Sequence, residues 1–180
     1  NVEQDEVFVE HIRSIADRLC KGEPIQYIFG HARFHGHEFK VTPATLIPRP
    51  ETELLVDMIT DDAGGAADLR VLDIGTGSGC IAISLALALR WPEVEAFDIS
   101  AEALAVAKEN AASLKAKVDY VQTDILTAVP EADSLDVVVS NPPYICDSER
   151  ADMERSVLEH EPTTALFVPA ADPLLFYRAI

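Results

Sequence analysis

The chain has 180 residues, 48% of them hydrophobic and 25% charged, a composition that suits one globular domain with a sizeable core. Its 31 acidic and 14 basic side chains give a formal charge of -17, which repels phosphate backbones and disfavours nucleic acid as a direct partner. Three cysteines without a Cys-x-x-Cys pair indicate neither a disulfide framework nor a zinc site, and no apolar run is long enough for a membrane span. We therefore expect a reduced, cytoplasmic protein without a membrane partner.

The segment over residues 7–21 has the apolar spacing of one amphipathic helix. Its large apolar side chains recur at intervals of four, three and four residues, at Phe8, Ile12, Ile15 and Leu19. Gly22 supplies a stop signal at the C-terminal end. Because a lone helix with an apolar stripe needs a packing partner, we interpret residues 1–30 as the remnant of a helical N-terminal domain.

Residues 31–50 change period and are interpreted as a connector. Apolar and polar side chains alternate over residues 32–41 on either side of His35 and Gly36, which predicts a short β-hairpin. Three prolines follow within residues 42–50. They exclude a regular helix and favour an extended path of the chain.

Residues 51–180 alternate between helical and strand patterns. A helix is predicted after Pro50, with Glu51 and Glu53 in its first turn and apolar side chains at Leu54, Leu55, Met58 and Ile59. Strands are predicted over 69–74, 94–98, 118–121 and 135–140, and helices over 81–89 and 101–114, the second capped by Ser100. The alternation predicts an α/β fold with a parallel sheet, helices on both faces and a ligand crevice at the carboxyl ends of the strands.

A glycine loop lies between the first of these strands and its helix. It reads Asp73-Ile74-Gly75-Thr76-Gly77-Ser78-Gly79. Such glycines let the backbone approach a ligand next to the free N–H groups of a helix start. A dinucleotide fingerprint requires Gly-x-Gly-x-x-Gly, and Cys80 occupies its last glycine position, so the spacing argues against NAD. A plain strand-to-helix turn is the alternative.

Two carboxylates end predicted strands near this loop. Asp98 follows the loop by about 20 residues, where an acidic side chain can accept both ribose hydroxyls of NAD or of adenosylmethionine. Asp124 follows the third strand. Either carboxylate can equally be a solvated strand end, so the pair alone does not decide the ligand.

The sequence Asn141-Pro142-Pro143-Tyr144 directly follows the fourth strand, at the same edge as the glycine loop. The Asn141 side-chain carbonyl can accept a hydrogen bond from an NH2 group, and the proline after it restricts its backbone. The Pro142 carbonyl can accept the second N–H, and Tyr144 offers a flat face to a planar amide or base. Two acceptors and a flat wall would hold a planar nitrogen for in-line attack on a sulfonium methyl and stabilise the charge that develops on it. A Pro-Pro turn alone would leave the flanking Asn and Tyr unexplained.

Together these motifs resemble the class I amino-methyltransferases, and upstream segments narrow the resemblance to the peptide chain release factor glutamine methyltransferases, the HemK or PrmC family. The segments that carry it are Asp73–Gly79, Asn141–Ile145, Gly22–Tyr27, Ile47–Glu53 and His160-Glu161-Pro162. The resemblance implies an enzyme with a Rossmann-like fold that uses S-adenosylmethionine and releases S-adenosylhomocysteine. Its implied partner is a peptide chain release factor, methylated on N5 of the glutamine in a Gly-Gly-Gln motif.

The same resemblance implies roles for individual residues. The methionine part of the cofactor would lie on the glycine loop, at Asp73, Gly75, Thr76, Gly77 and Gly79. The ribose would be held by Asp98 and the adenine by Asp124 with Ile125, and Ile99 and Asn141 would complete the cofactor site. The catalytic residues would be Asn141, Pro142 and Tyr144, and the substrate site would also include Pro143, Arg49 and Glu51.

The chain departs from that family at both ends. Only about one helix of the helical N-terminal domain is recognisable, and the chain stops at Ile180 after four strands, where the sheet of the family continues. We therefore expect a sheet truncated at the C-terminus, residues 51–180 forming an incomplete methyltransferase domain. Weak cofactor binding would follow.

Histidines and cysteines have ordinary explanations. The hairpin contains His31, His35 and His37, but no further ligands accompany them, so we predict exposed histidines and no metal site. Cys80 and Cys146 lie near the predicted crevice. Methyl transfer from a sulfonium needs no covalent nucleophile, so we assign them no role.

Two charged side chains each allow two interpretations. Arg49, between two prolines, can contact a substrate carbonyl or form an ion pair with Glu51 or Glu53. Glu161, before Pro162, can face the amide pocket or water.

Two other functions fit part of the pattern. A DNA or other nucleobase N6-adenine methyltransferase would also use Asn-Pro-Pro-Tyr, because an adenine amino group is a planar nitrogen. Such an enzyme must hold a polyanion, and the acidic chain lacks a basic stripe. A non-catalytic nucleotide-binding module is the second alternative, disfavoured by the glycine spacing and by the intact Asn-Pro-Pro-Tyr motif.

Overall fold

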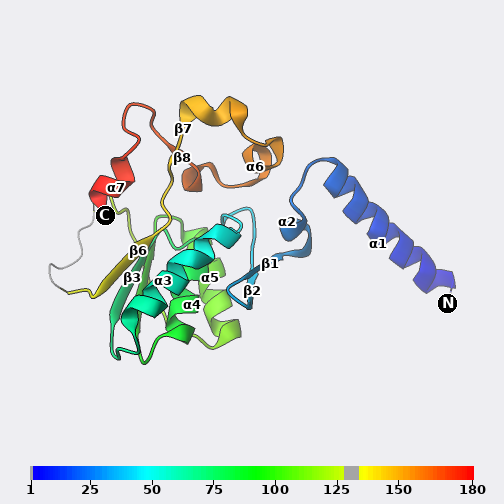
Figure 1. Ribbon diagram of the computed structural model, residues 1–180. Helices are drawn as coiled ribbons and strands as arrows, with labels where there is room; N and C mark the ends of the chain where they lie inside the picture. Colours follow the sequence, from blue (N-terminus) through cyan, green and yellow to red (C-terminus); the bar gives the residue numbers. More distant parts are fainter. Residues whose placement is uncertain (1, 128–133) are drawn as a thin grey trace.

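The computed structural model describes residues 2–127 and 134–180 (Figure 1). Helix α1 (Val2–Cys20) extends away from the rest of the molecule and is followed by the short helix α2 (Ile25–Phe29). The predicted hairpin is confirmed, with β1 (His31–Phe34) antiparallel to β2 (His37–Lys40). The Pro-rich segment then runs without regular structure to the 3-10 turn η1 (Pro50–Thr52).

The centre of the molecule is a four-stranded sheet in which all strands are parallel, as predicted. Its strand order is β5-β4-β3-β6, formed by β3 (Arg70–Ile74), β4 (Glu93–Asp98), β5 (Asp119–Gln122) and β6 (Val137–Ser140). Ile74 pairs with Phe97 on one side and with Ser140 on the other. This register aligns the carboxyl ends of three strands, so the loops that follow them meet at one edge.

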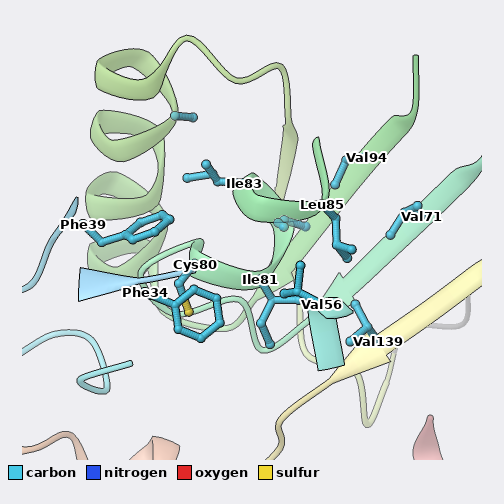
Figure 2. Packing of buried hydrophobic residues seen from close by; sticks show 13 residues of the cluster. Phe34, Phe39, Val56, Val71, Cys80, Ile81, Ile83, Leu85, Val94 and Val139 are labelled. Carbon is cyan, nitrogen blue, oxygen red and sulfur yellow. The ribbon is translucent and has the colours of Figure 1, made fainter. Parts of the chain in front are cut away.

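Three helices form one layer on one face of the sheet: α3 (Glu53–Ala63), α4 (Cys80–Ala88) and α5 (Ala101–Leu114). Helix α4 lies between the other two and contacts both. The predicted cap of α5 is confirmed, because the Ser100 hydroxyl accepts a hydrogen bond from the Ala103 amide at 3.1 Å. The main core fills the space between this layer and the sheet (Figure 2).

The hairpin belongs to this core through its aromatic side chains. Phe34 and Phe39 are fully buried, pack edge to face with ring centroids 6.1 Å apart, and lie beside Cys80 and Ile81 of α4 (Figure 2). Period-two alternation thus directs one face of the hairpin inward, as the sequence predicted. The division of the chain at residues 30 and 50 stays a prediction.

Two apolar faces differ from their expected packing. In α3 the buried residue is Val56, whereas Leu54 and Met58 are 61% and 63% exposed. The spacing of apolar residues predicted Leu54 and Met58 on the buried face. The helix is instead rotated so that Val56 faces the core. The stripe of α1 includes Phe8, Ile12 and Leu19, and these side chains are exposed rather than packed against another described segment.

The C-terminal part lies over the carboxyl ends of the strands. It consists of β7 (Ile145–Cys146), η2 (Asp147–Asp152), α6 (Arg155–His160), η3 (Thr163–Ala165), β8 (Phe167–Val168) and α7 (Leu175–Ala179), with β7 and β8 paired in parallel. Because these segments gather at that edge, the second helical layer that we expected is not formed by the described residues. Val121 and Val138 on that second face are exposed. Within the same residues, no helix combines the length and the apolar content needed to cross a bilayer.

Candidate functional site

A cavity of about 350 Å³ opens at the carboxyl ends of β3, β4 and β6. Nine of the residues predicted for the site line it, namely Gly75, Gly77, Asp98, Ile99, Asp124, Ile125, Asn141, Pro142 and Pro143. The other walls come from the Pro-rich segment, through Ala44 and Leu46, and from the C-terminal segments, through Pro162 and Phe176. The parallel topology therefore brings the loops after these strands together, and the cavity as a whole joins segments that are more than 100 residues apart in sequence.

The glycine loop is shaped by close packing on the helices behind it. A Cβ atom added to Gly79 would lie 3.0 Å from Cδ1 of Ile83 and 3.1 Å from Cβ of Ala107, and its φ is 81°. Only glycine fits that approach without displacing α5. The loop is also fixed to the next strand, because the amides of Gly75 and Thr76 both donate to the Phe97 carbonyl.

Asp98 is oriented by two backbone amides. Its Oδ2 accepts from the Gly77 amide at 2.8 Å and its Oδ1 from the Ser100 amide at 2.9 Å. Each carboxylate oxygen keeps a further lone pair, so the group can still accept two hydroxyl donors. The arrangement fits the ribose role that was predicted for this side chain.

Asp73 and Thr76 lie beneath the loop and do not line the cavity. The buried Asp73 carboxyl accepts from the Thr76 hydroxyl at 2.7 Å and from the Ala82 amide at 3.2 Å, which joins strand, loop and helix α4. Its second oxygen, Oδ1, has no hydrogen-bond partner. Burial raises the pKa of Asp73 to about 7, against the lowering effect of these two donors. The two residues thus support the loop from behind.

Aliphatic side chains form another part of the cavity lining. They come from Ile99, Ile125 and Leu126, and Ile99 is 57% exposed. Asp124 uses Oδ1 to accept from the Leu126 amide at 2.9 Å, which fixes the turn after β5. A flat aromatic base fits between such aliphatic walls, with a carboxylate at its edge.

A second cavity of about 150 Å³ adjoins the first. Tyr144 and Arg49 line it together with Ile145, Met153, Val157 and Leu166. Asn141, Pro142, Leu46 and Ala165 line both cavities and so form the wall between them. Glu51, which was predicted for the substrate site, is exposed and lines neither cavity.

The Asn141 amide is held by a residue that the sequence reasoning missed. Its Nδ2 donates to the Thr52 hydroxyl at 3.4 Å, which leaves Oδ1 as the acceptor at the other end of the same amide. The residue before it, Ser140, donates through its hydroxyl to the Ile74 carbonyl at 2.7 Å and ties β6 to β3. Thr52 follows Glu51 in the sequence motif, but nothing in its spacing indicated a contact with β6.

Arg49 pairs with Glu161, not with Glu51 or Glu53. Its guanidinium lies 2.6 Å from the Glu161 carboxylate, whose other oxygen accepts from the Ile47 amide at 3.1 Å. The Glu161 side chain is 1% exposed and that of Arg49 36% exposed. Glu161 thus faces neither an open amide pocket nor water, and it ties the Pro-rich segment to the segment before η3.

These two cavities occur in a chain whose residues 50–162 match the model of a known family, the methyltransferase small domain. The chain belongs to the methyltransferase small domain family. The matched residues include the glycine loop, both strand-end carboxylates and the Asn141 and Pro142 part of the wall between the cavities. The other two wall residues, Leu46 and Ala165, lie outside the matched range.

Curated proteins from several bacteria are similar to this chain in sequence. The chain is 52% identical over 170 residues to the release factor glutamine methyltransferase of Bacteroides thetaiotaomicron, covering 94% of this chain and 60% of that protein. The corresponding enzyme of Koribacter versatilis is 47% identical over 83% of this chain and 54% of its own length. The chain therefore spans little more than half the length of these curated relatives.

Among solved structures, the T. thermophilus 16S rRNA methyltransferase RsmC, in complex with AdoMet and guanosine, superposes with a TM-score of 0.54. It is 23% identical, and the match covers 64% of this chain and 32% of that one. This likeness supports the class I methyltransferase fold that was predicted.

The histidines and cysteines are absent from the lining of both cavities. His35 lies 3.0 Å from Asp57 of α3, and His31 lies 3.8 Å from Glu38 of the same hairpin. In residues 2–127 and 134–180, no group of three or more His, Cys, Asp or Glu side chains is placed to hold a metal ion. Cys80 is packed in the core, where burial raises its thiol pKa to about 12.

Proposed function

We propose that this chain is the methyltransferase part of an enzyme that transfers a methyl group from S-adenosylmethionine to the side-chain amide nitrogen of a glutamine. By the names of its relatives, that glutamine belongs to a peptide chain release factor, and we place it in the Gly-Gly-Gln motif. One observation carries the proposal: Asn141 and Pro142 line both cavities, so they stand between a donor in the larger one and an amide in the smaller one.

The larger cavity fits S-adenosylmethionine by the chemistry of its walls. Asp98 would accept the ribose hydroxyls, the loop at Gly75 and Gly77 would take the methionine part, and Ile99 and Ile125 would enclose the adenine. When bound, this cofactor supplies an electrophilic methyl group on a sulfonium, and S-adenosylhomocysteine is left. Asp73, Thr76 and Gly79 would act indirectly, by holding the loop in place.

The substrate amide would be positioned by the wall and the smaller cavity. Asn141 Oδ1 and the Pro142 carbonyl would accept its two N–H donors, and Tyr144 would cover its plane. Both acceptors would also stabilise positive charge on the nitrogen as its lone pair leaves conjugation. Arg49 retains donors beyond its bond to Glu161 and lines the same cavity, where they can bind a carbonyl of the substrate.

The competing assignment, an adenine N6-methyltransferase, would place a flipped base in the smaller cavity. The formal charge of -17 opposes a nucleic acid strand at its mouth. A direct experiment separates the two assignments. Labelled S-adenosylmethionine is incubated with the protein and either a release factor or DNA, and the label is located by mass spectrometry. Label on the glutamine supports the proposal, whereas label on DNA alone contradicts it.

Asn141→Ala tests the wall itself. It removes one of the two acceptors, so transfer should fall by about 10² to 10³ while cofactor affinity stays near that of the wild type. Labelled product formation and calorimetric titration measure the two quantities. Glu159→Ala, on the exposed side of α6, is the control and should change neither. Equal loss of transfer and of cofactor binding in Asn141→Ala would contradict the role of the wall.

A further inference from the structure

Asn110 is a buried amide in α5 that uses all of its donors. Its Oδ1 accepts from the Lys40 amide at 2.7 Å, and its Nδ2 donates to the Lys40 carbonyl at 3.0 Å and to the Ser78 carbonyl at 2.9 Å. One side chain therefore joins three elements: helix α5, the end of the hairpin and the glycine loop. Asn110 itself lines neither cavity.

At the hairpin, the Asn110 amide takes the place of a neighbouring strand. Lys40 is the last residue of β2 and pairs with His31 of β1, but both of its own peptide groups bond to Asn110. A carboxamide offers the same donor and acceptor as a peptide group, so it can satisfy the open edge of β2. The position of β2 on α5 is thereby fixed in register.

At the glycine loop, the bond to Ser78 adds to a packing contact. Gly79 lies against Ala107, one helical turn before Asn110 on α5. The Ser78 carbonyl is thus held on the same side of the loop, while Gly75 and Gly77 face the larger cavity from the other. A shift of the loop away from α5 would therefore break the hydrogen bond between Asn110 and Ser78 and, at the same time, separate Gly79 from Ala107.

The hairpin also leads directly into the wall of the site. Val41 follows Lys40 and is buried with Tyr27 and Ile47, and the Tyr27 hydroxyl donates to the Thr45 carbonyl at 2.6 Å. Ala44, Thr45 and Leu46 then line the larger cavity. The end of β2 is therefore connected to that cavity along two routes, through the chain and through Asn110.

We propose that Asn110 is a positioning residue that couples the hairpin to the glycine loop, so that cofactor binding and ordering of the hairpin strengthen each other. This inference rests on the proposed cofactor site. A ligand that orders the loop fixes the Ser78 carbonyl, and Asn110 transmits that order to the edge of β2. By linkage, a protein partner that holds the hairpin would tighten cofactor binding by the same factor.

The test compares the wild-type full chain with Asn110→Ala, Asn110→Asp and Glu109→Ala. Asn110→Asp keeps the size and the acceptor but, when ionised, loses both donated bonds. Glu109→Ala removes only the exposed ion pair between Lys40 and Glu109 on the next position of α5, and serves as the matched control. Circular dichroism checks that each variant is folded.

Two measurements are made with S-adenosylmethionine, the dissociation constant by calorimetry and hydrogen exchange over residues 31–41 with and without the cofactor. We expect the dissociation constant to rise about five- to tenfold in both Asn110 variants, because a change of that size corresponds to the loss of about one hydrogen bond. It should be unchanged in Glu109→Ala. The cofactor should slow exchange of the hairpin in the wild type and in Glu109→Ala but not in the Asn110 variants.

Wild-type affinity in both Asn110 variants, or cofactor-dependent protection of their hairpins, would overturn the coupling. A wild-type chain that binds no cofactor would instead overturn the proposed function, and the coupling with it.

Discussion

At the scale of single residues, the site depends on which end of the Asn141 amide faces the cavities. An asparagine amide has a donor end and an acceptor end, and only the acceptor suits an incoming NH2 group. The bond from Nδ2 to the Thr52 hydroxyl, at 3.4 Å, turns the donor end toward Thr52 and leaves the acceptor end for a substrate. Pre-orientation of this kind lowers the barrier by removing reorganisation at the moment of reaction.

Thr52→Val tests this orientation, because it replaces the hydroxyl by a methyl group of similar size. Loss of one hydrogen bond of about 1 kcal/mol should lower kcat roughly fivefold and leave cofactor affinity unchanged. Thr52→Ser should restore kcat. Steady-state kinetics with a release factor measure the effect, and a serine variant as slow as the valine variant would show that the hydroxyl is not responsible.

Asp73 makes stability depend on pH in an unusual direction. Burial raises its pKa to about 7 in the folded chain, far above the usual value near 3.8, and the Asp98 charge adds to this. Between these values the unfolded chain ionises while the folded chain keeps the proton, so the contribution of Asp73 to stability falls as pH rises.

Asp73→Asn cannot ionise and removes this dependence. Relative to the wild type, the variant should gain stability between about pH 4 and pH 7, by up to about 1.4 kcal/mol per pH unit, and the difference should level off above pH 7. Urea unfolding at several pH values measures the free energy of unfolding of both proteins. Subtracting one from the other removes the effect of all other titrating groups, because the two proteins share them. Parallel curves for the two proteins would contradict a raised Asp73 pKa.

At the scale of elements, Glu161 joins two segments without regular structure. It binds Arg49 and the Ile47 amide across 112 and 114 residues of sequence, and both partners belong to the Pro-rich segment. Prolines keep that segment extended, but they do not decide where it lies. The buried Glu161 carboxylate fixes the position of the Pro-rich segment through these two contacts.

Glu161→Ala should therefore destabilise the fold by about 3 kcal/mol, because it leaves the Arg49 charge without its partner and the Ile47 amide unpaired. The matched control is Glu159→Ala, which removes an exposed ion pair with Arg155 and should cost less than about 0.5 kcal/mol. Denaturant unfolding compares the two. Equal losses would mean that the pair contributes no more than a surface contact.

Elements whose signal is local could be predicted from the sequence. The hairpin, the four strands, the cap at Ser100 and the glycine loop each depend on neighbouring residues, and each is present. The exposed Leu54 and Met58 were not foreseen, since helical spacing defines a stripe but not which part of it meets the sheet. That choice is made by the packing of α3 against α4.

The residues of the site also fall into those that could be predicted from local sequence and those that could not. Parallel strands bring their carboxyl ends together, so Asp98, Asn141 and the glycine loop could be placed at one cavity in advance. Thr52, Glu161 and Asn110 act through partners that are distant in sequence, at separations of 89, 112 and 70 residues for Asn141, Arg49 and Lys40 and of 32 residues for Ser78. A single sequence contains no periodic or spacing signal for such pairs.

At the scale of the whole molecule, charge separates the proposed substrate from its rival. A chain with a formal charge of -17 repels a polyanion, and this repulsion is strongest at low salt. A labelled DNA duplex titrated with the protein in about 50 mM salt should show no change in fluorescence anisotropy. Binding that weakens steeply with added salt would indicate a local basic surface and favour the nucleobase assignment.

The sheet order gives Asn141 an unusual support. It follows β6, which among the described strands is hydrogen-bonded to β3 alone, and the Ser140 hydroxyl adds one further tether at the tip. A strand that is hydrogen-bonded along one edge can fray from the other, and here its fraying end leads into Asn141, the side chain on which the proposed methyl transfer depends. A strand or partner that paired with the other edge of β6 would therefore stabilise the proposed reaction without touching any atom that takes part in it.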